Sequence, residues 1–329
     1  MKAKAHVAIP PLCSSGLMLT YRCTNACRHC LYYCSPRQPD EWLTVEMAER
    51  IFAALGREHS FSGLHFAGGE ATLNMERLLE VVRLARQKRV PIDYLETNAS
   101  WCDDYDETVR QLRRLKDAGL LCVLVSVCMY HNEFVPFSHM KNCIHACREV
   151  LGPDGAFVYP SHLYTMLERL PDEGTHSLRE FCEYLGIGVD SQELHALFPL
   201  IPGGRAVKAL RGFYKVQPVD TFARDNCGPN LQSPHHAHLD LYGNLFTGGC
   251  AGICPGTVDN LHPQITEDTF PVFWTLCHEG PVGLLRLAPD FIPDPNGYAG
   301  KCDVCFDVRK HLHATGEYPE LRPASFYEV

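Results

Sequence analysis

The chain has 329 residues, which is enough for one large α/β domain with a small appendage. Hydrophobic residues make up 46% of it and charged residues 21%, a composition that predicts a packed core and excludes a disordered chain. The formal net charge is −9 and no run is rich in Lys or Arg, so neither nucleic acid nor an anionic membrane is expected as the main partner.

The strands are expected at 16–22, 62–67, 91–96, 120–127, 155–159 and 193–200, and the helices between them at 44–56, 74–89, 104–118, 139–151 and 176–186. This alternation predicts βαβ units and therefore an α/β fold with a parallel sheet. Ligands of such sheets bind at the carboxyl ends of the strands.

The composition changes after about residue 200, where Gly, Pro, Asn and His become frequent. A short β-hairpin is expected at 238–250, with Gly243-Asn244 as its turn. We therefore predict a domain at 1–205 and a small, loop-rich domain at 206–329, which a metal cluster could stabilise in place of a large core. The histidines of the HHAH segment at 235–238 are interpreted as polar loop residues.

Targeting segments and the cysteine content bear on location. The N-terminus has no apolar stretch of signal-peptide length, and no 18 consecutive residues are apolar. A soluble, cytoplasmic protein is expected. Its 17 cysteines are then more consistent with reduced thiols that bind metal or act in catalysis than with disulfides.

Cys23, Cys27 and Cys30 lie on one loop directly after the first expected strand. Three closely spaced thiolates can bind three irons of a [4Fe–4S] cluster and leave the fourth iron open to another ligand. Zinc is the alternative, with Cys34 as a fourth ligand.

This loop resembles the C-x3-C-x-Φ-C motif of radical S-adenosylmethionine (SAM) enzymes, with His29 in the Φ position near the adenine. The resemblance implies a partial (β/α)6 barrel and a cluster whose open iron is chelated by SAM. It also implies reductive cleavage of SAM to a 5′-deoxyadenosyl radical that abstracts hydrogen from a substrate C–H bond. A flavodoxin- or ferredoxin-type protein would donate the electron, and Cys34 would have no part.

The segment HFAGGEATL at 65–73 is similar to the GGE motif of the same family. The resemblance implies that Gly68, Gly69 and Glu70 contact the SAM amino group. Glycines permit a close approach of the backbone, and a carboxylate suits an ammonium. Asn98 and Ser126 fall where the family commonly has ribose or carboxylate contacts.

A second cysteine set lies near the C-terminus and could form a four-thiolate cubane or a zinc site. It is similar to the SPASM and twitch extensions of radical SAM enzymes, which implies one auxiliary [4Fe–4S] cluster with Cys227, Cys250, Cys302 and Cys305 as ligands. Cys250 is preferred to Cys254 because the hairpin delivers it, although the spacing leaves the choice open. Cys254 would then be a candidate donor of a hydrogen atom to a substrate radical.

His131 and Glu133 follow the fourth strand at the same end of the sheet and are candidates for acid–base catalysis or substrate binding. The sequence thus predicts a radical SAM enzyme that acts on a small molecule or a peptide. The outcome would be an oxidation if the auxiliary cluster accepts the substrate electron, and an epimerisation if a cysteine returns a hydrogen atom. A peptide maturase and a non-enzymatic zinc or iron–sulfur protein are the alternatives.

Overall fold

The computed structural model describes residues 6–328. Its centre is one continuous eight-stranded sheet, in the order β5-β4-β3-β2-β1-β6-β7-β8. The first five strands pair in parallel and are β1 (Ser14–Met18), β2 (Gly63–Ala67), β3 (Ile92–Thr97), β4 (Val123–Ser126) and β5 (Ala156–Tyr159). The predicted α/β class with a parallel sheet is therefore confirmed.

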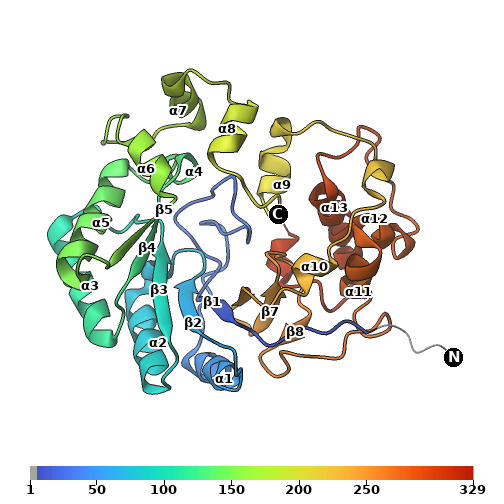
Figure 1. The fold of residues 1–329 in the computed structure, drawn as a ribbon, viewed down its shortest axis with the longest axis horizontal. Coiled ribbons are helices and arrows are strands. Elements are labelled where there is room, and N and C mark those ends of the chain that lie inside the picture. Colours follow the sequence, from blue (N-terminus) through green and yellow to red (C-terminus); the bar gives the residue numbers. More distant parts are fainter. Residues whose placement is uncertain (1–5, 329) are drawn as a thin grey trace.

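The helices that connect these strands cover one face of the curved sheet (Figure 1). They are α1 (Val45–Leu55), α2 (Met75–Gln87), α3 (Tyr105–Ala118) and α5 (Phe137–Leu151). The short helices η1 (Ala71–Asn74) and α4 (Met129–Asn132) follow β2 and β4. The start of α2 agrees with its sequence, because the Asn74 side chain accepts a hydrogen bond from the backbone N–H of Arg77. The apolar faces of these helices pack on the sheet, while its other face borders the functional site.

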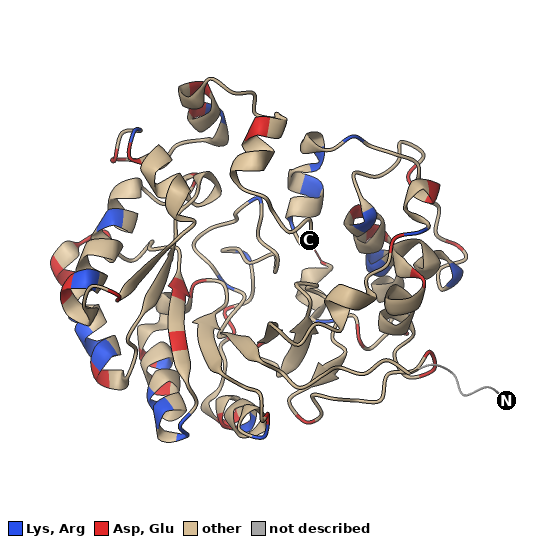
Figure 2. Ribbon diagram, in the orientation of Figure 1, with Lys and Arg blue, Asp and Glu red and all other residues tan. Residues whose placement is uncertain are grey.

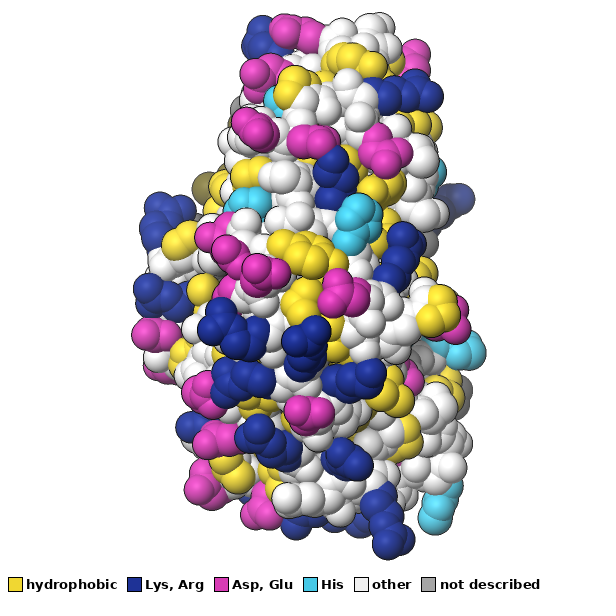
Figure 3. Space-filling model, turned by 90° about the vertical axis from the view of Figure 1, so that its left-hand side faces the viewer, with side chains coloured by type: hydrophobic (Ala, Val, Ile, Leu, Met, Phe, Trp, Pro, Cys, Tyr) yellow, Lys and Arg dark blue, Asp and Glu magenta, His cyan; other side chains and the backbone are white. Residues whose placement is uncertain are grey.

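Charged residues of both signs lie along the outer helices (Figure 2), and the surface formed on that side mixes basic and acidic side chains (Figure 3). Arg114 of α3 lies 2.6 Å from Glu76 of α2, and Arg113 lies 3.7 Å from Glu149 of α5. Such exposed pairs contribute about 0–1 kcal/mol each to stability. Among the described residues, no helix is both long and apolar enough to span a membrane.

The predicted strand at 193–200 is wrong. Residues 192–197 form the helix α8 (Gln192–Leu197), because the Ser191 side chain caps its N-terminus by accepting from the N–H of Leu194. The other helices of this middle segment are α6 (Ser161–Leu167), α7 (Leu178–Leu185) and α9 (Ala206–Ala209), followed by η2 (Arg211–Phe213) and η3 (Val219–Phe222).

The C-terminal part extends the sheet on the β1 side. β6 (Ala237–Leu239) pairs in parallel with β1 and forms the predicted hairpin with β7 (Asn244–Thr247), which continues into β8 (Gly256–Thr257). Its helices are α10 (Gly228–Leu231), α11 (Pro271–His278), α12 (Gly280–Gly283), η4 (Leu284–Arg286), α13 (Lys301–Thr315) and η5 (Ala324–Phe326). The loop after β1 therefore lies between the parallel strands and the C-terminal helices (Figure 1).

Candidate functional site

A cavity of about 320 Å³ lies at the carboxyl ends of the parallel strands. The predicted residues that line it come from several parts of the chain: Cys23, Cys27, His29, Cys30, Gly68, Gly69, Asn98, Ser126 and His131. Residues that are more than 100 positions apart in the sequence thus meet at the carboxyl ends of the strands, as expected for a parallel sheet.

The first three cysteines are close enough for their thiols to interact. Burial, and then the neighbouring Cys30 and Cys23, raise the pKa of Cys27 well above its usual range. Burial, followed by the charge of Glu70, raises the pKa of Cys23 to about 12. Cys30 differs, because a hydrogen bond with Cys34 and the nearby Arg205 lower its pKa to about 6. A metal cluster binds cysteines as thiolates, so a bound cluster would offset the cost of burying their charge.

Arg205 anchors the cysteine loop through hydrogen bonds to its backbone. Its guanidinium donates to the carbonyl oxygens of Cys27 at 2.7 Å and Cys34 at 2.8 Å, and its backbone N–H donates to the carbonyl of Cys30 at 2.9 Å. It also lies 5.3 Å from the centre of the Tyr33 ring. Three backbone contacts from one residue fix the path of a loop that has no regular secondary structure of its own.

The Gly68-Gly69 segment anchors the start of the same loop. The N–H groups of Gly69 and Glu70 donate to the carbonyls of Thr20 at 2.7 Å and Arg22 at 2.9 Å. A Cβ on Gly69 would lie 1.8 Å from the Arg22 carbonyl oxygen, so any side chain there would push the loop away. Glycine is required at this position by the close approach of two backbones.

The Glu70 carboxylate is buried and hydrogen-bonded within the protein, and Glu70 is not among the residues that line the cavity. It is 1% exposed and accepts from the hydroxyls of Thr72 at 2.7 Å and Thr97 at 2.9 Å, and from the N–H of Asn98 at 2.9 Å. These contacts tie the end of β2 to the end of β3. Glu70 is thus a positioning residue for Asn98, whose side-chain amide lies 3.5 Å from the sulfur of Cys23.

Glu96 is a cavity residue that the sequence analysis missed. It lies on β3, lines the cavity, and the Ser126 hydroxyl donates to it at 3.4 Å. Burial raises its pKa to about 7. Its place in the pleat, two residues before Asn98 and beside Ser126 on the next strand, is the signal that could have identified it.

The cavity contains polar atoms that need a partner. The side-chain amide of Asn25, Nδ1 of His29 and the hydroxyl of Tyr32 are buried, and none has a hydrogen-bond partner among the described residues. All three residues line the cavity. Buried polar groups without partners are rare in native proteins, so a polar ligand is expected here.

A second group of cysteines lies in the C-terminal part. Burial, followed by the neighbouring thiols of Cys305, Cys250 and Cys302, raises the pKa of Cys227 to about 12. Cys254 is not among the groups that act on Cys227. Cys277 of α11 also adjoins this second group, because its thiol interacts with Cys250.

Arg309 of α13 is a buried cation beside this second group. Its guanidinium interacts with Cys305 and Cys250 and donates to the Ala251 carbonyl at 3.0 Å and to the Tyr327 hydroxyl at 3.1 Å. The Nε of Arg309 has no hydrogen-bond partner among residues 6–328. A cation with a spare N–H at this place suits an anionic cluster bound by thiolates.

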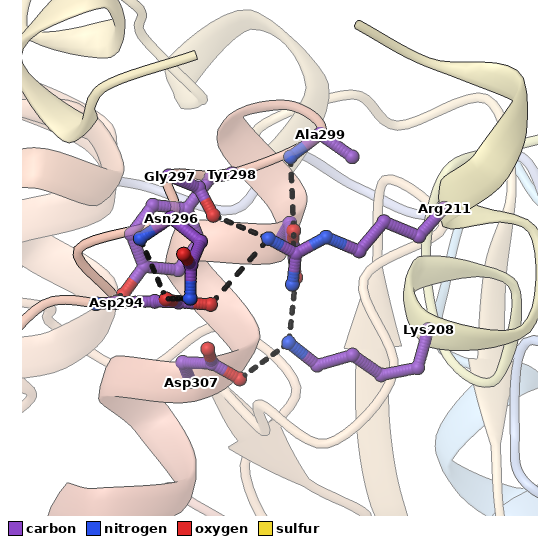
Figure 4. A network of polar contacts seen from close by, with 9 residues as sticks. Lys208, Arg211, Asp294, Asn296, Gly297, Tyr298, Ala299 and Asp307 are labelled. Carbon is purple, nitrogen blue, oxygen red and sulfur yellow. Dashed lines mark hydrogen bonds and ion pairs between the residues drawn. The ribbon is translucent and has the colours of Figure 1, made fainter. Parts of the chain in front are cut away.

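A polar network fixes the start of α13 (Figure 4). Cys302 and Cys305 lie on this part of the helix. Asp303 is 3% exposed and accepts from the Lys208 ammonium at 2.7 Å and the Ala299 N–H at 2.9 Å. Arg211 lies 3.8 Å from the same carboxylate. The segment after α9 is thereby connected to the helix that presents the last two cysteines.

Ligand atoms of three or more side chains lie within 4.8 Å of one another at two places among residues 6–328. One group is His29, Cys128 and His131, and the other is His65, His236 and His238.

The family model described as "Radical SAM superfamily" matches residues 17–151. This range contains the cysteine loop, the Gly-Gly segment, Asn98 and Ser126. Residues 17–151 belong to the radical SAM superfamily. The cofactors of a radical SAM domain are a [4Fe–4S] cluster and SAM, and the buried polar atoms of the cavity fit a ligand of this kind.

Solved structures of similar arrangement include BtrN in complex with AdoMet and 2-DOIA, with 12% identity and a TM-score of 0.44, over 82% of this chain and 89% of that one. Native anSMEcpe with bound AdoMet and the Cp18Cys peptide has 14% identity and a TM-score of 0.43, over 93% of this chain and 99% of that one. No curated protein sequence matches the chain significantly.

Two residues that we expected to act in catalysis lie outside the lining of the radical SAM cavity. Glu133 is paired with Arg28 at 2.9 Å. Cys254 lines a separate cavity of about 260 Å³, and its thiol donates to the Gly256 carbonyl at 2.7 Å. Residues of the hairpin and the C-terminal segment enclose Cys254, so the spacing alone could not place it. His131, by contrast, lines the main cavity, with its Nδ1 3.0 Å from the Cys128 sulfur.

Proposed function

We propose that this chain is a radical SAM enzyme that abstracts a hydrogen atom from a C–H bond of a small molecule or a peptide. Cys23, Cys27 and Cys30 would bind the first [4Fe–4S] cluster, whose reduction by a flavodoxin- or ferredoxin-type donor permits cleavage of SAM to a 5′-deoxyadenosyl radical. The observation that carries the proposal is the meeting of these cysteines with Gly68 and Gly69 at one cavity.

The residues around the cavity would bind and orient SAM and the substrate. Asn98 and Ser126 offer polar side chains at the ends of β3 and β4. His29 packs against the rings of Tyr130 and Phe198, with ring centres 5.1 and 5.6 Å apart, in an apolar wall suited to a flat adenine. Glu96, whose pKa is raised to about 7, could exchange a proton with a bound group near neutral pH.

Cys227, Cys250, Cys302 and Cys305 would bind the auxiliary [4Fe–4S] cluster. Arg309 beside them would stabilise its negative charge and raise its reduction potential. This arrangement favours an oxidation, in which the auxiliary cluster accepts the electron of the substrate radical. The alternative of an epimerisation with Cys254 as hydrogen donor loses support, because Cys254 is outside the lining of the cavity.

All seventeen cysteines have free thiols, which is consistent with a reducing compartment such as the cytoplasm. We therefore include a cytoplasmic location in the proposal.

The proposal is tested by incubating the cluster-loaded protein with SAM and dithionite without oxygen and measuring 5′-deoxyadenosine by chromatography. Wild-type protein should form it, and Cys30→Ala should not. Cys13→Ala, which changes a cysteine outside both sets, is the matched control and should behave as wild type. Failure of iron-loaded wild-type protein, in an assay where a known radical SAM enzyme succeeds, would contradict the proposal.

A further inference from the structure

Three histidines gather on the inner face of the sheet, below the cavity. They are His65 on β2, His236 just before β6 and His238 on β6. The ring centres are 4.8–5.4 Å apart, and one ring nitrogen from each residue lies within 4.8 Å of the others. Neither iron–sulfur site of the proposed function uses any of these side chains.

Gly16 makes this cluster possible. It lies on β1 between the other two strands, in register with His65 on one side and with His238 on the other. A Cβ at Gly16 would lie 2.6 Å from Nε2 of His65 and 2.6 Å from Nε2 of His238. The missing side chain therefore leaves a space onto which two ring nitrogens converge.

The hydrogen bonds of Ser14 determine the tautomer of His236. The single hydroxyl hydrogen of Ser14 is donated to the His235 carbonyl at 2.8 Å, so the hydroxyl accepts from Nδ1 of His236, which lies 2.8 Å away. Nδ1 of His236 thus carries the proton and Nε2 carries the lone pair. Metal-binding histidines are commonly oriented by such a bond from the other ring nitrogen.

The other two rings are also held in position and uncharged. The Tyr94 ring stacks on that of His65, with centres 4.8 Å apart and planes 14° from parallel. Burial lowers the pKa of His65 to about 3 and that of His238 well below its usual range. Neutral imidazole is the form of histidine that binds metal ions.

We propose that His65, His236 and His238 bind one divalent transition-metal ion such as Zn²⁺. Imidazole ligands suit Zn²⁺, Fe²⁺ and Ni²⁺, and three protein ligands leave a coordination position for water or substrate. His238 lines the main cavity, whereas His236 is exposed to solvent. The ion would be accessible from outside and would offer a substrate oxygen or nitrogen atom a ligand position at the bottom of the cavity.

The test uses cluster-loaded protein, so that the cluster cysteines are occupied, and Zn²⁺ as the probe. Zinc affinity is measured by competition with a coloured chelator, and the ligand atoms by X-ray absorption at the zinc edge. Wild-type protein should bind one zinc ion per chain with nitrogen ligands at about 2.0–2.1 Å. His236→Gln should weaken binding at least about tenfold, while His235→Gln, a change at the neighbouring exposed histidine, should not.

Sulfur ligands at about 2.3 Å, no bound zinc, or equal affinity of wild type and His236→Gln would each overturn the proposal. Iron content and circular dichroism check that the variants are folded, which is expected because His236 lies on the surface. Ser14→Ala supplies a second measurement, with binding weakened about tenfold through the loss of the orienting hydrogen bond. None of these measurements requires SAM, so their result is independent of the radical activity.

Discussion

Glu96 is a cavity side chain whose ionisation depends strongly on the fold. Burial raises its pKa from the usual 4.5 to about 7. The folded protein therefore holds this proton at pH values at which the unfolded chain has lost it. The resulting stabilisation is fully present below about pH 4.5 and is lost as the pH rises to about 7.

We predict that the free energy of unfolding falls by about 1 kcal/mol more in wild-type protein than in Glu96→Gln when the pH rises from about 6 to about 8. The amide keeps the shape of the side chain but does not titrate. Thermal unfolding of both proteins at the two pH values measures the difference. Equal losses in the two proteins would show that the carboxyl group does not change its charge in this range.

Other residues of the site show what a local pattern can and cannot reveal. Cys23, Cys27, Cys30, Gly68 and Gly69 could be predicted, because short spacing and strand ends determine where they lie. The direction of the Glu70 side chain depends on Thr97 and Asn98, which belong to another strand. The histidine cluster depends on the pairing of β1 with β6, more than 200 residues apart. For this reason the HHAH segment at 235–238 was interpreted as polar loop residues.

At the scale of elements, the strands and helices of the first 160 residues follow the hydrophobic pattern closely. Further along the chain, α8 departs from this pattern, because the apolar run at 193–200 favours a strand. The Ser191 cap and the early Glu193 instead favour a helix, and residues 198–201 line the cavity. β5 therefore remains the last strand at its edge of the sheet.

The start of α13 depends on a single buried carboxylate, that of Asp303. We predict that Asp303→Asn destabilises the protein by about 1–3 kcal/mol and speeds the loss of iron from the C-terminal site, because Lys208 and Arg211 lose the charge they share. Asp294→Asn is the matched control: this residue pairs with Arg211 at 3.5 Å but is more exposed, so a much smaller loss of stability is expected. Thermal unfolding and iron release to a chelator measure both effects. Similar values for the two variants would contradict this role of Asp303.

At the scale of the whole molecule, the chain separates two sets of cysteines but joins them through one sheet. β6 to β8 extend the parallel strands, and Arg205, which precedes α9, holds the first cysteine loop. A change in the C-terminal part could therefore reach the radical SAM cavity through Arg205 and His238. Strands from both sides of the predicted domain boundary at 205–206 belong to the same sheet, so the sheet continues across it.

The central claim is that the two cysteine sets bind separate clusters and that SAM binds only to the cluster of Cys23, Cys27 and Cys30. Iron analysis combined with electron paramagnetic resonance of the reduced protein, with and without SAM, tests it most directly. Wild-type protein and Cys254→Ala should contain about eight irons per chain, and Cys250→Ala and the triple variant of Cys23, Cys27 and Cys30 to Ala about four. SAM should change the spectrum of Cys250→Ala and leave that of the triple variant unchanged. Stoichiometric zinc without iron, or a SAM-dependent change in the triple variant, would contradict the account.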